Sequence, residues 1–185
     1  MFQAIAKFFL FNVLKWKVVG GFPKDIKKYV LIGVPHTSNF DFIIGLLLKL
    51  ALKVPINFLG KKSLFKFPFG SFFKAVGGIP VDRKKNEKMV DAITRIFKEK
   101  DQFVFAISPE GTRSKVTDWK TGFYYIASQA KVPIVGLTFD YKNKQTEVFE
   151  PFIPTGDIEA DFKFLKSRYK NIVGKVPKNS FDVVD

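Results

Sequence analysis

The only histidine of the chain lies five residues before one of the two acids found in the first 75 residues. His36 follows the apolar run YVLIGVP and opens the sequence HTSNFD, which ends at Asp41. An imidazole that donates one ring N–H to a carboxylate keeps its other nitrogen free as a base, which is the orienting half of a catalytic triad. A structural interpretation also fits, because Ser38 and Asp41 have the spacing of a capping box that begins a helix. The two interpretations are compatible.

The residues that the chain lacks limit what a base at His36 could activate. There is no cysteine, which excludes thiol nucleophiles, disulfides and thiolate metal sites. No G-x-S-x-G sequence is present, so a serine nucleophile of the α/β-hydrolase type is not expected. A single histidine without cysteine gives little support to zinc, and no metal is expected. A base at His36 is therefore expected to take a proton directly from a substrate hydroxyl.

Two further groups of polar residues follow apolar runs. In SPEGTRS, the backbone N–H groups of a glycine-containing turn, the hydroxyls of Thr112 and Ser114 and the guanidinium of Arg113 together suit a phosphate. The same residues are also ordinary turn formers. The sequence GGIPVDR ends at Arg83, the first arginine of the chain. Arginine there suits bidentate binding of an anion, and the simpler alternative is a solvated charge beside Asp82.

Strand-like and helical patterns alternate along the chain. The predicted strands cover 29–34, 56–60, 78–81, 103–108 and 133–139, with an edge strand at 146–152. The predicted helices cover 2–16, 38–53, 86–100, 119–130 and 157–171, with one or two short helices between 61 and 77 that break at Pro68 and Gly70. This alternation is typical of an α/β fold. We expect an N-terminal amphipathic helix at 1–20, then a single layered domain at 21–185 with a mostly parallel sheet flanked by helices.

The predicted helix 2–16 has a broad apolar face and a narrow polar stripe. The apolar face comprises Phe2, Ile5, Phe9, Val13 and Trp16, and the polar stripe comprises Gln3, Lys7 and Lys15. Such a helix lies in a membrane interface with its lysines extended to the head groups, or it packs on the domain.

The formal charge of +14 and the pI of about 9.8 indicate an anionic partner. The first 75 residues combine 12 lysines and no arginine with many phenylalanines, which suits a surface resting on anionic lipid. A basic surface over a Phe-rich core is the alternative. Lysines interrupt each apolar run, so no run reaches the roughly 20 residues of a membrane-spanning helix. No small-x-small cleavage site of a signal peptide follows the N-terminal run.

HTSNFD, GGIPVDR, PEGTRS and VPIVGL occur in this order between residues 36 and 137. Together they resemble the four motif blocks of the glycerolipid acyltransferase family, whose best-known members are 1-acylglycerol-3-phosphate acyltransferases. The flanking sequences FLGKKSLF and WKTGF have matching character. Two features depart from the family pattern. The chain is short and lacks a spanning helix, so attachment to a membrane would be monotopic, and the stretch 119–124 looks like a subfamily variant.

The resemblance implies a role for each matching residue. His36 would be the general base, Asp41 its orienting partner and Arg83 a contact to the phosphate of the acceptor. Glu110, Gly111, Thr112 and Arg113 would form the phosphate-binding turn, with Glu110 also holding the site together. Lys61 and Lys120 would serve the acceptor or the phosphates of the acyl donor, and Pro133 would shape the apolar wall near the acyl chain.

The activity implied is transfer of a fatty acyl group from acyl-CoA or acyl carrier protein to a glycerol hydroxyl of a lysophospholipid, such as 1-acylglycerol-3-phosphate, in phospholipid synthesis. No bound cofactor is implied, and the expected location is the cytoplasmic face of an anionic membrane, peripheral or monotopic. The alternatives are a basic nucleic-acid-binding module, for which no binding motif is visible, and a lipid-binding relative without catalysis. The intact pair of His36 and Asp41, together with PEGTRS, favours the enzyme.

Overall fold

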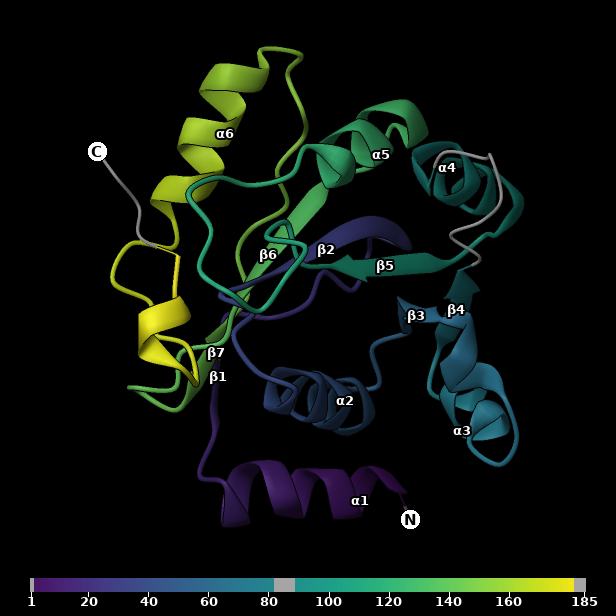
Figure 1. Ribbon diagram of the computed structural model, residues 1–185, viewed down its shortest axis with the longest axis vertical. Coiled ribbons are helices and arrows are strands. Elements are labelled where there is room, and N and C mark those ends of the chain that lie inside the picture. Colours follow the sequence, from purple (N-terminus) through teal and green to yellow (C-terminus); the bar gives the residue numbers. More distant parts are fainter. Residues whose placement is uncertain (1, 82–88, 182–185) are drawn as a thin grey trace.

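A parallel β-sheet forms the centre of the computed structural model, which describes residues 2–81 and 89–181 (Figure 1). The sheet has five strands in the order β4-β3-β5-β2-β6. These are β2 (Lys28–Val34), β3 (Ile56–Lys61), β4 (Gly78–Val81), β5 (Phe103–Ile107) and β6 (Ile134–Thr138). Each neighbouring pair runs parallel, so the carboxyl ends of all five strands lie along one edge of the sheet.

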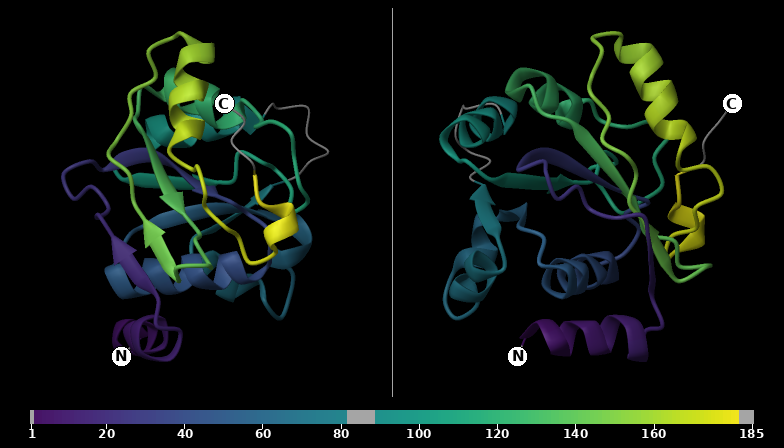
Figure 2. Two further views of the ribbon diagram at one scale, coloured as in Figure 1. Left: turned by 90° about the vertical axis from the view of Figure 1, so that its left-hand side faces the viewer. Right: turned by 180° about the vertical axis from the view of Figure 1, so that it is seen from behind.

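Helices cover both faces of the sheet, as Figures 1 and 2 show. One layer holds α1 (Phe2–Lys7), its π-helical continuation η1 (Phe8–Val13) and α2 (Phe40–Leu52). The other layer holds α4 (Met89–Glu99), α5 (Gly122–Ala130) and α6 (Ile158–Ser167). The short helices are η2 (Lys62–Phe65) and α3 (Gly70–Ala75), which connect β3 to β4, and η3 (Pro177–Asn179) near the end of the described chain. A separate parallel pair joins β1 (Lys17–Val19) to β7 (Gln145–Glu147).

The interior strand β2 shows why this sheet needs a helical layer on each face. Val30, Ile32 and Val34 point into the hydrophobic core under α4 and α5, whereas Tyr29 and Leu31 point into the core under α2. Successive side chains of a strand alternate between faces, so a strand buried on both faces is apolar throughout. The run YVLIGV is such a strand. The predicted α/β architecture with its mostly parallel sheet is therefore confirmed.

The boundaries of several predicted elements differ from the structure. The helix predicted at 119–130 begins at Gly122, and the one predicted at 157–171 ends at Ser167. The segment predicted as an edge strand, 146–152, pairs with β1 through β7 and then makes two isolated antiparallel bridges to β6, at Leu137 and Ile134. Strand β1 had no signal in the sequence, because a strand of three residues carries too little periodicity to detect.

The N-terminal helix packs on α2 along its inner side. Ala6 and Leu10 are buried there, and Gln3 donates a hydrogen bond of 3.1 Å from Nε2 to the carbonyl of Ala51. The outer side is exposed and carries Phe2, Ile5, Phe8, Phe9 and Val13, with Lys7 and Lys15 beside them. Within the described ranges, no helix has both the length and the apolar content needed to cross a bilayer.

The prediction that Trp16 shares this outer face is wrong. The chain leaves the helix after Val13, and Lys15 adopts a left-handed backbone conformation with φ of 54°. Helical periodicity therefore does not extend to residue 16. Trp16 is buried, and its indole N–H donates to Thr146 Oγ1 at 3.0 Å.

Replacing Leu10 with Ala tests the packing of the N-terminal helix on α2. Leu10 is fully buried, so Leu10→Ala should lower the free energy of unfolding by about 2–5 kcal/mol. The matched control, Phe9→Ala on the exposed side, should change it by about 0.5 kcal/mol or less. Urea unfolding of the two variants measures the difference. Similarly small losses in both would mean that the helix does not pack on α2.

Candidate active site

The two polar turns predicted from the sequence meet at the carboxyl edge of the sheet. HTSNFD follows β2 and SPEGTRS follows β5, and these strands are direct neighbours, with Ile32 opposite Ile107. Because the strands are parallel, the turns that follow them emerge side by side. This edge is where α/β folds commonly place their sites.

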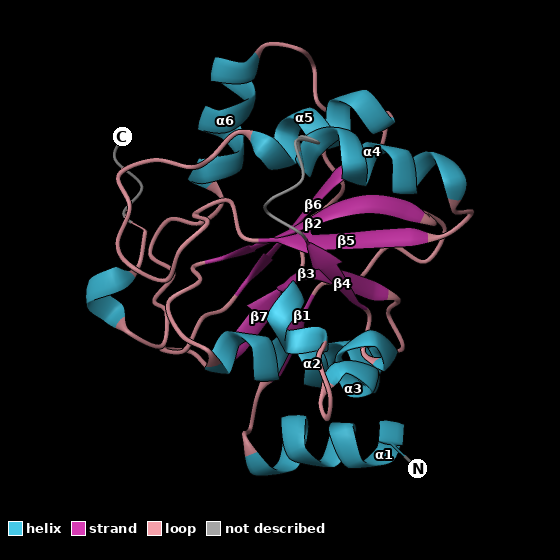
Figure 3. Cartoon of the chain, turned by 45° about the vertical axis from the view of Figure 1, so that its right-hand side comes forward, coloured by secondary structure: helices cyan, strands magenta, loops and turns pink. Residues whose placement is uncertain are grey.

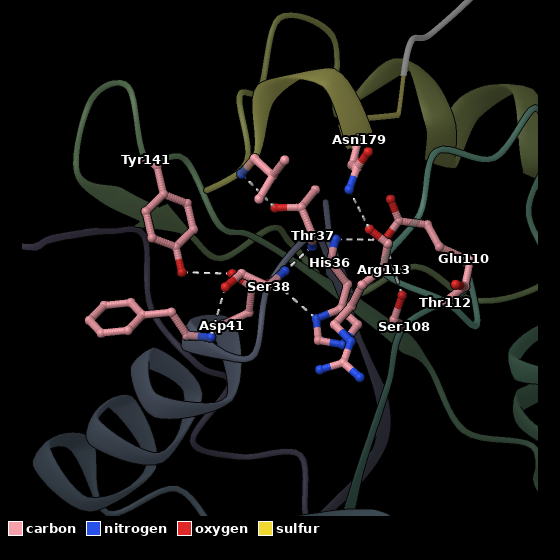
Figure 4. A network of polar contacts seen from close by, with 12 residues as sticks. His36, Thr37, Ser38, Asp41, Ser108, Glu110, Thr112, Arg113, Tyr141 and Asn179 are labelled. Atoms are coloured by element: carbon pink, nitrogen blue, oxygen red, sulfur yellow. Dashed lines mark hydrogen bonds and ion pairs between the residues drawn. The ribbon is translucent and has the colours of Figure 1, made fainter.

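His36 and Asp41 form a hydrogen-bonded pair in this turn (Figure 4). The His36 Nδ1 lies 3.0 Å from Asp41 Oδ2, with the imidazole 31% exposed and the carboxylate 1% exposed. An ionised carboxylate can only accept hydrogen bonds, so Nδ1 carries the ring proton. The second ring nitrogen, Nε2, is then an acceptor and can serve as a base.

The Asp41 carboxylate also organises the backbone of the turn. Its Oδ2 accepts from the N–H groups of Thr37 at 2.8 Å and Ser38 at 2.9 Å. Asp41 belongs to the first turn of α2, and Ser38 Oγ accepts from the N–H of Phe40. An acid that caps exposed N–H groups at a helix start stabilises the helix. The capping box is only half formed, because Asn39 is the N-cap and Ser38 Oγ binds the N–H of Phe40 instead of that of Asp41. The Asp41 half is present and the same carboxylate orients His36.

Tyr141 binds the other oxygen of Asp41 and was missed in the sequence. Its hydroxyl donates to Asp41 Oδ1 at 2.6 Å across 100 residues of chain. Burial, followed by the bond to Asp41 and its charge, raises the pKa of Tyr141 well above its usual range, so the hydroxyl stays protonated. The ring packs edge-on against Trp16, with centroids 5.0 Å apart. Tyr141 follows β6 closely, at the same edge of the sheet, and this position was the only feature of the sequence that could have indicated a role in the site.

Glu110 connects the two turns. Its carboxylate is 2% exposed and accepts from the backbone N–H of His36 at 2.6 Å and from the Ser108 hydroxyl at 3.1 Å. Burial raises the pKa of Glu110, and the hydrogen bond from the His36 backbone partly opposes this shift. The side chain thereby fixes the position of the histidine backbone relative to the second turn.

The turn after Glu110 presents a basic, exposed surface. Gly111 has φ of +66°, a backbone conformation that favours glycine, and an added Cβ there would lie 2.8 Å from the flexible end of the Lys120 side chain. Lys120 thus lies across the turn. Thr112 and Arg113 are exposed, and the Arg113 side chain extends from the turn in the direction of His36 in Figure 4. The structure brings these four predicted residues to the side of the pair formed by His36 and Asp41.

The C-terminal segment 173–180 forms hydrogen bonds to the loops that make up the site. Three hydrogen bonds make this connection: Val176 N–H to Thr37 Oγ1 at 3.1 Å, Tyr141 N–H to the Val173 carbonyl at 2.8 Å, and Asn179 Nδ2 to the Arg113 carbonyl at 3.0 Å. Each motif turn and the Tyr141 loop is therefore tied to the same segment. These are contacts that no pattern in the sequence indicated.

Lys61 is the last residue of β3, so its backbone lies at the same carboxyl edge of the sheet as the two turns. Arg83 lies outside the described residues. The structure does not bring Pro133 to the site. Pro133 is buried immediately before β6, where its carbonyl accepts from the N–H of Val30 at 3.0 Å. It is therefore at the amino end of the strand, and parallel strands keep the amino and carboxyl ends on opposite edges.

Comparison with known proteins identifies three similarities. The model of the Acyltransferase family matches residues 19–140. The 1-acyl-sn-glycerol-3-phosphate acyltransferase of Saccharomyces cerevisiae is 32% identical over 128 residues, which are 64% of this chain and 41% of that protein. The chain thus spans about two fifths of the yeast protein. The crystal structure of the 1-acyl-sn-glycerophosphate (LPA) acyltransferase PlsC from Thermotoga maritima superimposes with a TM-score of 0.64 and 21% identity, covering 90% of this chain and 76% of that one.

Replacing Glu110 with Gln tests the burial of this carboxyl through the pH dependence of stability. A raised pKa in the folded state means that stability is greatest below the ordinary pKa of glutamate and is lost as the pH rises through the folded value. Glu110→Gln keeps an oxygen for the His36 N–H but does not titrate. Its free energy of unfolding relative to wild type should therefore increase as the pH rises from 4 to 7. Urea unfolding of both proteins across this pH range measures the difference. If the free energies of unfolding of the variant and wild type changed with pH in parallel, the raised pKa of Glu110 would be contradicted.

Proposed function

Because the chain belongs to the acyltransferase family, we propose that it transfers a fatty acyl group from a thioester donor to a hydroxyl of a glycerolipid acceptor. The single observation that carries the proposal is the bond of 3.0 Å between His36 Nδ1 and the buried Asp41 carboxylate. This bond leaves Nε2 as an oriented base. The exposed basic turn of Gly111, Arg113 and Lys120 beside it suits a phosphorylated acceptor.

The reaction proceeds by direct transfer. His36 Nε2 takes the proton of the acceptor hydroxyl while the hydroxyl oxygen attacks the carbonyl carbon of the thioester. The tetrahedral intermediate then expels the thiolate, which takes the proton from the imidazolium. Asp41 stabilises the imidazolium and holds the ring in place, and Tyr141 and two backbone N–H groups hold Asp41. General base catalysis of this kind contributes about 10²–10⁴-fold, and positioning of the substrates contributes much of the remainder.

The acceptor that fits this site is a lysophospholipid such as 1-acylglycerol-3-phosphate. The guanidinium of Arg113 matches a phosphate in two hydrogen bonds. The Thr112 hydroxyl lies on the same turn, and the Lys120 side chain lies across it. Arg83 and Lys61 remain proposed contacts to the phosphates of the substrates. The 1-acyl-sn-glycerol-3-phosphate acyltransferase activity named for the yeast relative supports this choice. The donor is acyl-CoA or acyl carrier protein, and the product enters phospholipid synthesis.

The enzyme acts at the cytoplasmic surface of an anionic membrane to which it attaches peripherally. The outer side of α1 and η1 supports this location, because five large apolar side chains are exposed there beside lysines. An interfacial helix with this composition buries its apolar side at the level of the acyl chains while lysines contact the head groups. The opposite side of this helix, which includes Leu10, is buried and packs against the domain.

Substitutions in the His36 network test the proposed chemistry. His36→Ala should abolish transfer, with a rate loss of about 10²-fold or more, and should also lower stability, because it removes one hydrogen-bond donor from the buried Asp41 carboxylate. Asp41→Asn should cut the rate severely because it disturbs the orientation of the imidazole. Tyr141→Phe removes the hydrogen bond from the Tyr141 hydroxyl to the Asp41 carboxylate. It should lower kcat about tenfold, which corresponds to the loss of one hydrogen bond to a charged group, and leave KM unchanged. Steady-state assays with an acyl-CoA and a lysophospholipid pool measure these effects. Near wild-type turnover in His36→Ala would show that His36 is not the general base and that the proposed mechanism is wrong.

Arg113→Lys tests the phosphate-binding turn. The substitution keeps the charge but removes the planar pair of N–H donors, and Arg113 is exposed, so folding should be unaffected. The KM for a phosphorylated acceptor should rise about tenfold, the loss of one charge-assisted hydrogen bond. The dephosphorylated analogue, assayed in parallel, should be almost unaffected. Equal losses on the two acceptors would assign Arg113 a structural role.

A further inference from the structure

The connection between β3 and β4 exposes an unusual group of large apolar side chains. We call residues 62–74 the phenylalanine loop; it comprises η2, a turn and most of α3. Its exposed side chains are Leu64 at 42%, Phe67 at 98%, Phe69 at 67% and Phe72 at 51%. Exposed apolar side chains gathered in one segment mark an interaction surface rather than the ordinary scatter of surface residues.

The base of the phenylalanine loop is packed in a defined conformation. The Phe65 ring lies against Gly60 and Gly78, where an added Cβ would come within 2.8 and 2.9 Å of it, and a Cβ on Gly70 would collide with the Phe65 backbone. Phe65 also packs edge-on against Phe73, with centroids 6.1 Å apart. The outward direction of the other apolar side chains is therefore imposed by the fold.

The surface around these side chains is basic. Lys62, Lys66 and Lys74 are exposed within the phenylalanine loop. The sequence contains no acid between Asp41 and Asp82. Aromatic residues interleaved with lysines match the boundary of an anionic bilayer, where the rings enter the acyl region and the ammonium groups meet the head groups.

The phenylalanine loop lies at the same end of the molecule as the exposed side of α1. In Figure 3, α1, α2 and α3 gather below the sheet, while α4, α5 and α6 lie above it. Figures 1 and 2 show the same separation. The Phe42 ring of α2 contacts Phe73 of α3, with centroids 6.4 Å apart, and α2 packs on Ala6 of α1 and Leu10 of η1. The three helices are thus one connected layer.

We propose that the phenylalanine loop is a second membrane contact, which inserts Phe67 and Phe69 into an anionic bilayer while α1 lies in its interface. The inference rests on the membrane attachment in the proposed function. A bilayer fits better than a protein partner, because Phe67 projects almost fully into solvent and a protein would need a matching hollow for it. Two contacts on separate elements also fix the tilt of the domain relative to the membrane. A single interfacial helix would leave the domain free to rotate about the axis of that helix.

A tryptophan placed at the tip of the loop reports insertion directly. The native Trp16 and Trp119 are buried, so wild type gives a stable background. Phe67→Trp in the full chain should show a blue-shifted emission with vesicles of phosphatidylcholine and 30% phosphatidylglycerol, and quenching when the acyl chains are brominated. The matched control is Phe164→Trp on α6, which is 46% exposed on the opposite layer and should not respond.

Loss of the two aromatic tips should weaken binding without harming the fold. Vesicle sedimentation of Phe67→Ser/Phe69→Ser should show partitioning weaker by about tenfold or more, because each buried phenylalanine contributes at least that factor. Phe164→Ser should bind as wild type does. Activity of the double variant on a short-chain, water-soluble acceptor should be unchanged.

Three results would overturn the proposal. An unresponsive Phe67→Trp, in a protein that still sediments with vesicles, would show attachment through α1 alone and leave the transferase activity intact. A spectral shift that grows with protein concentration in the absence of vesicles would identify a contact between copies of the chain. Equal loss of activity on soluble and vesicle-bound acceptors in Phe67→Ser/Phe69→Ser would place the loop in the substrate site instead.

Discussion

Asp41 carries a carboxylate that is 1% exposed, and a buried charge is tolerated only when hydrogen-bond donors surround it. Four donors do so: the His36 ring, the N–H groups of Thr37 and Ser38, and the Tyr141 hydroxyl. Each donor comes from a segment whose position is thereby restricted. The turn after β2, the first turn of α2 and the loop after β6 must all converge on this one group. The orientation of the imidazole follows from the same requirement, so the site and the fold around it are stabilised together.

The parallel topology supplies the second level of organisation. It places the turns after β2 and β5 next to each other, and Glu110 then joins them through the backbone of His36. The C-terminal segment 173–180 closes the arrangement by bonding to both turns and to the backbone of Tyr141. None of these links uses the side-chain atom that would do chemistry. The imidazole Nε2 and the exposed groups of Thr112 and Arg113 therefore stay available to substrates while their backbones are held.

Helix α2 connects the chemistry to the apolar end of the molecule. Its first turn carries Asp41, and its far end accepts the hydrogen bond from Gln3 of α1 at Ala51. The layer that we place on the membrane thus rests directly on the helix that orients the base. The same layer exposes phenylalanines on α1 and on the loop around Phe67, whereas the layer of α4, α5 and α6 faces away from it. This division matches the sequence, in which the first 75 residues hold 13 of the 23 phenylalanines but only two of the 17 acids.

Local features of the sequence determined the strands of the central sheet, most helices, the spacing of His36 and Asp41 and the turn at Gly111, because each depends on residues only a few positions apart. Tertiary structure decided the rest. Trp16 is turned inward by a change of backbone conformation at Lys15 that ends the helical period, and Pro133 lies at the amino edge because of the strand it precedes. Tyr141 reaches Asp41 across 100 residues. Composition could not distinguish the buried Phe105 from the exposed Phe67 either. Whether a side chain is buried, and which group it bonds, depends on surfaces contributed by segments far away in the sequence. A local sequence pattern carries no information about those surfaces.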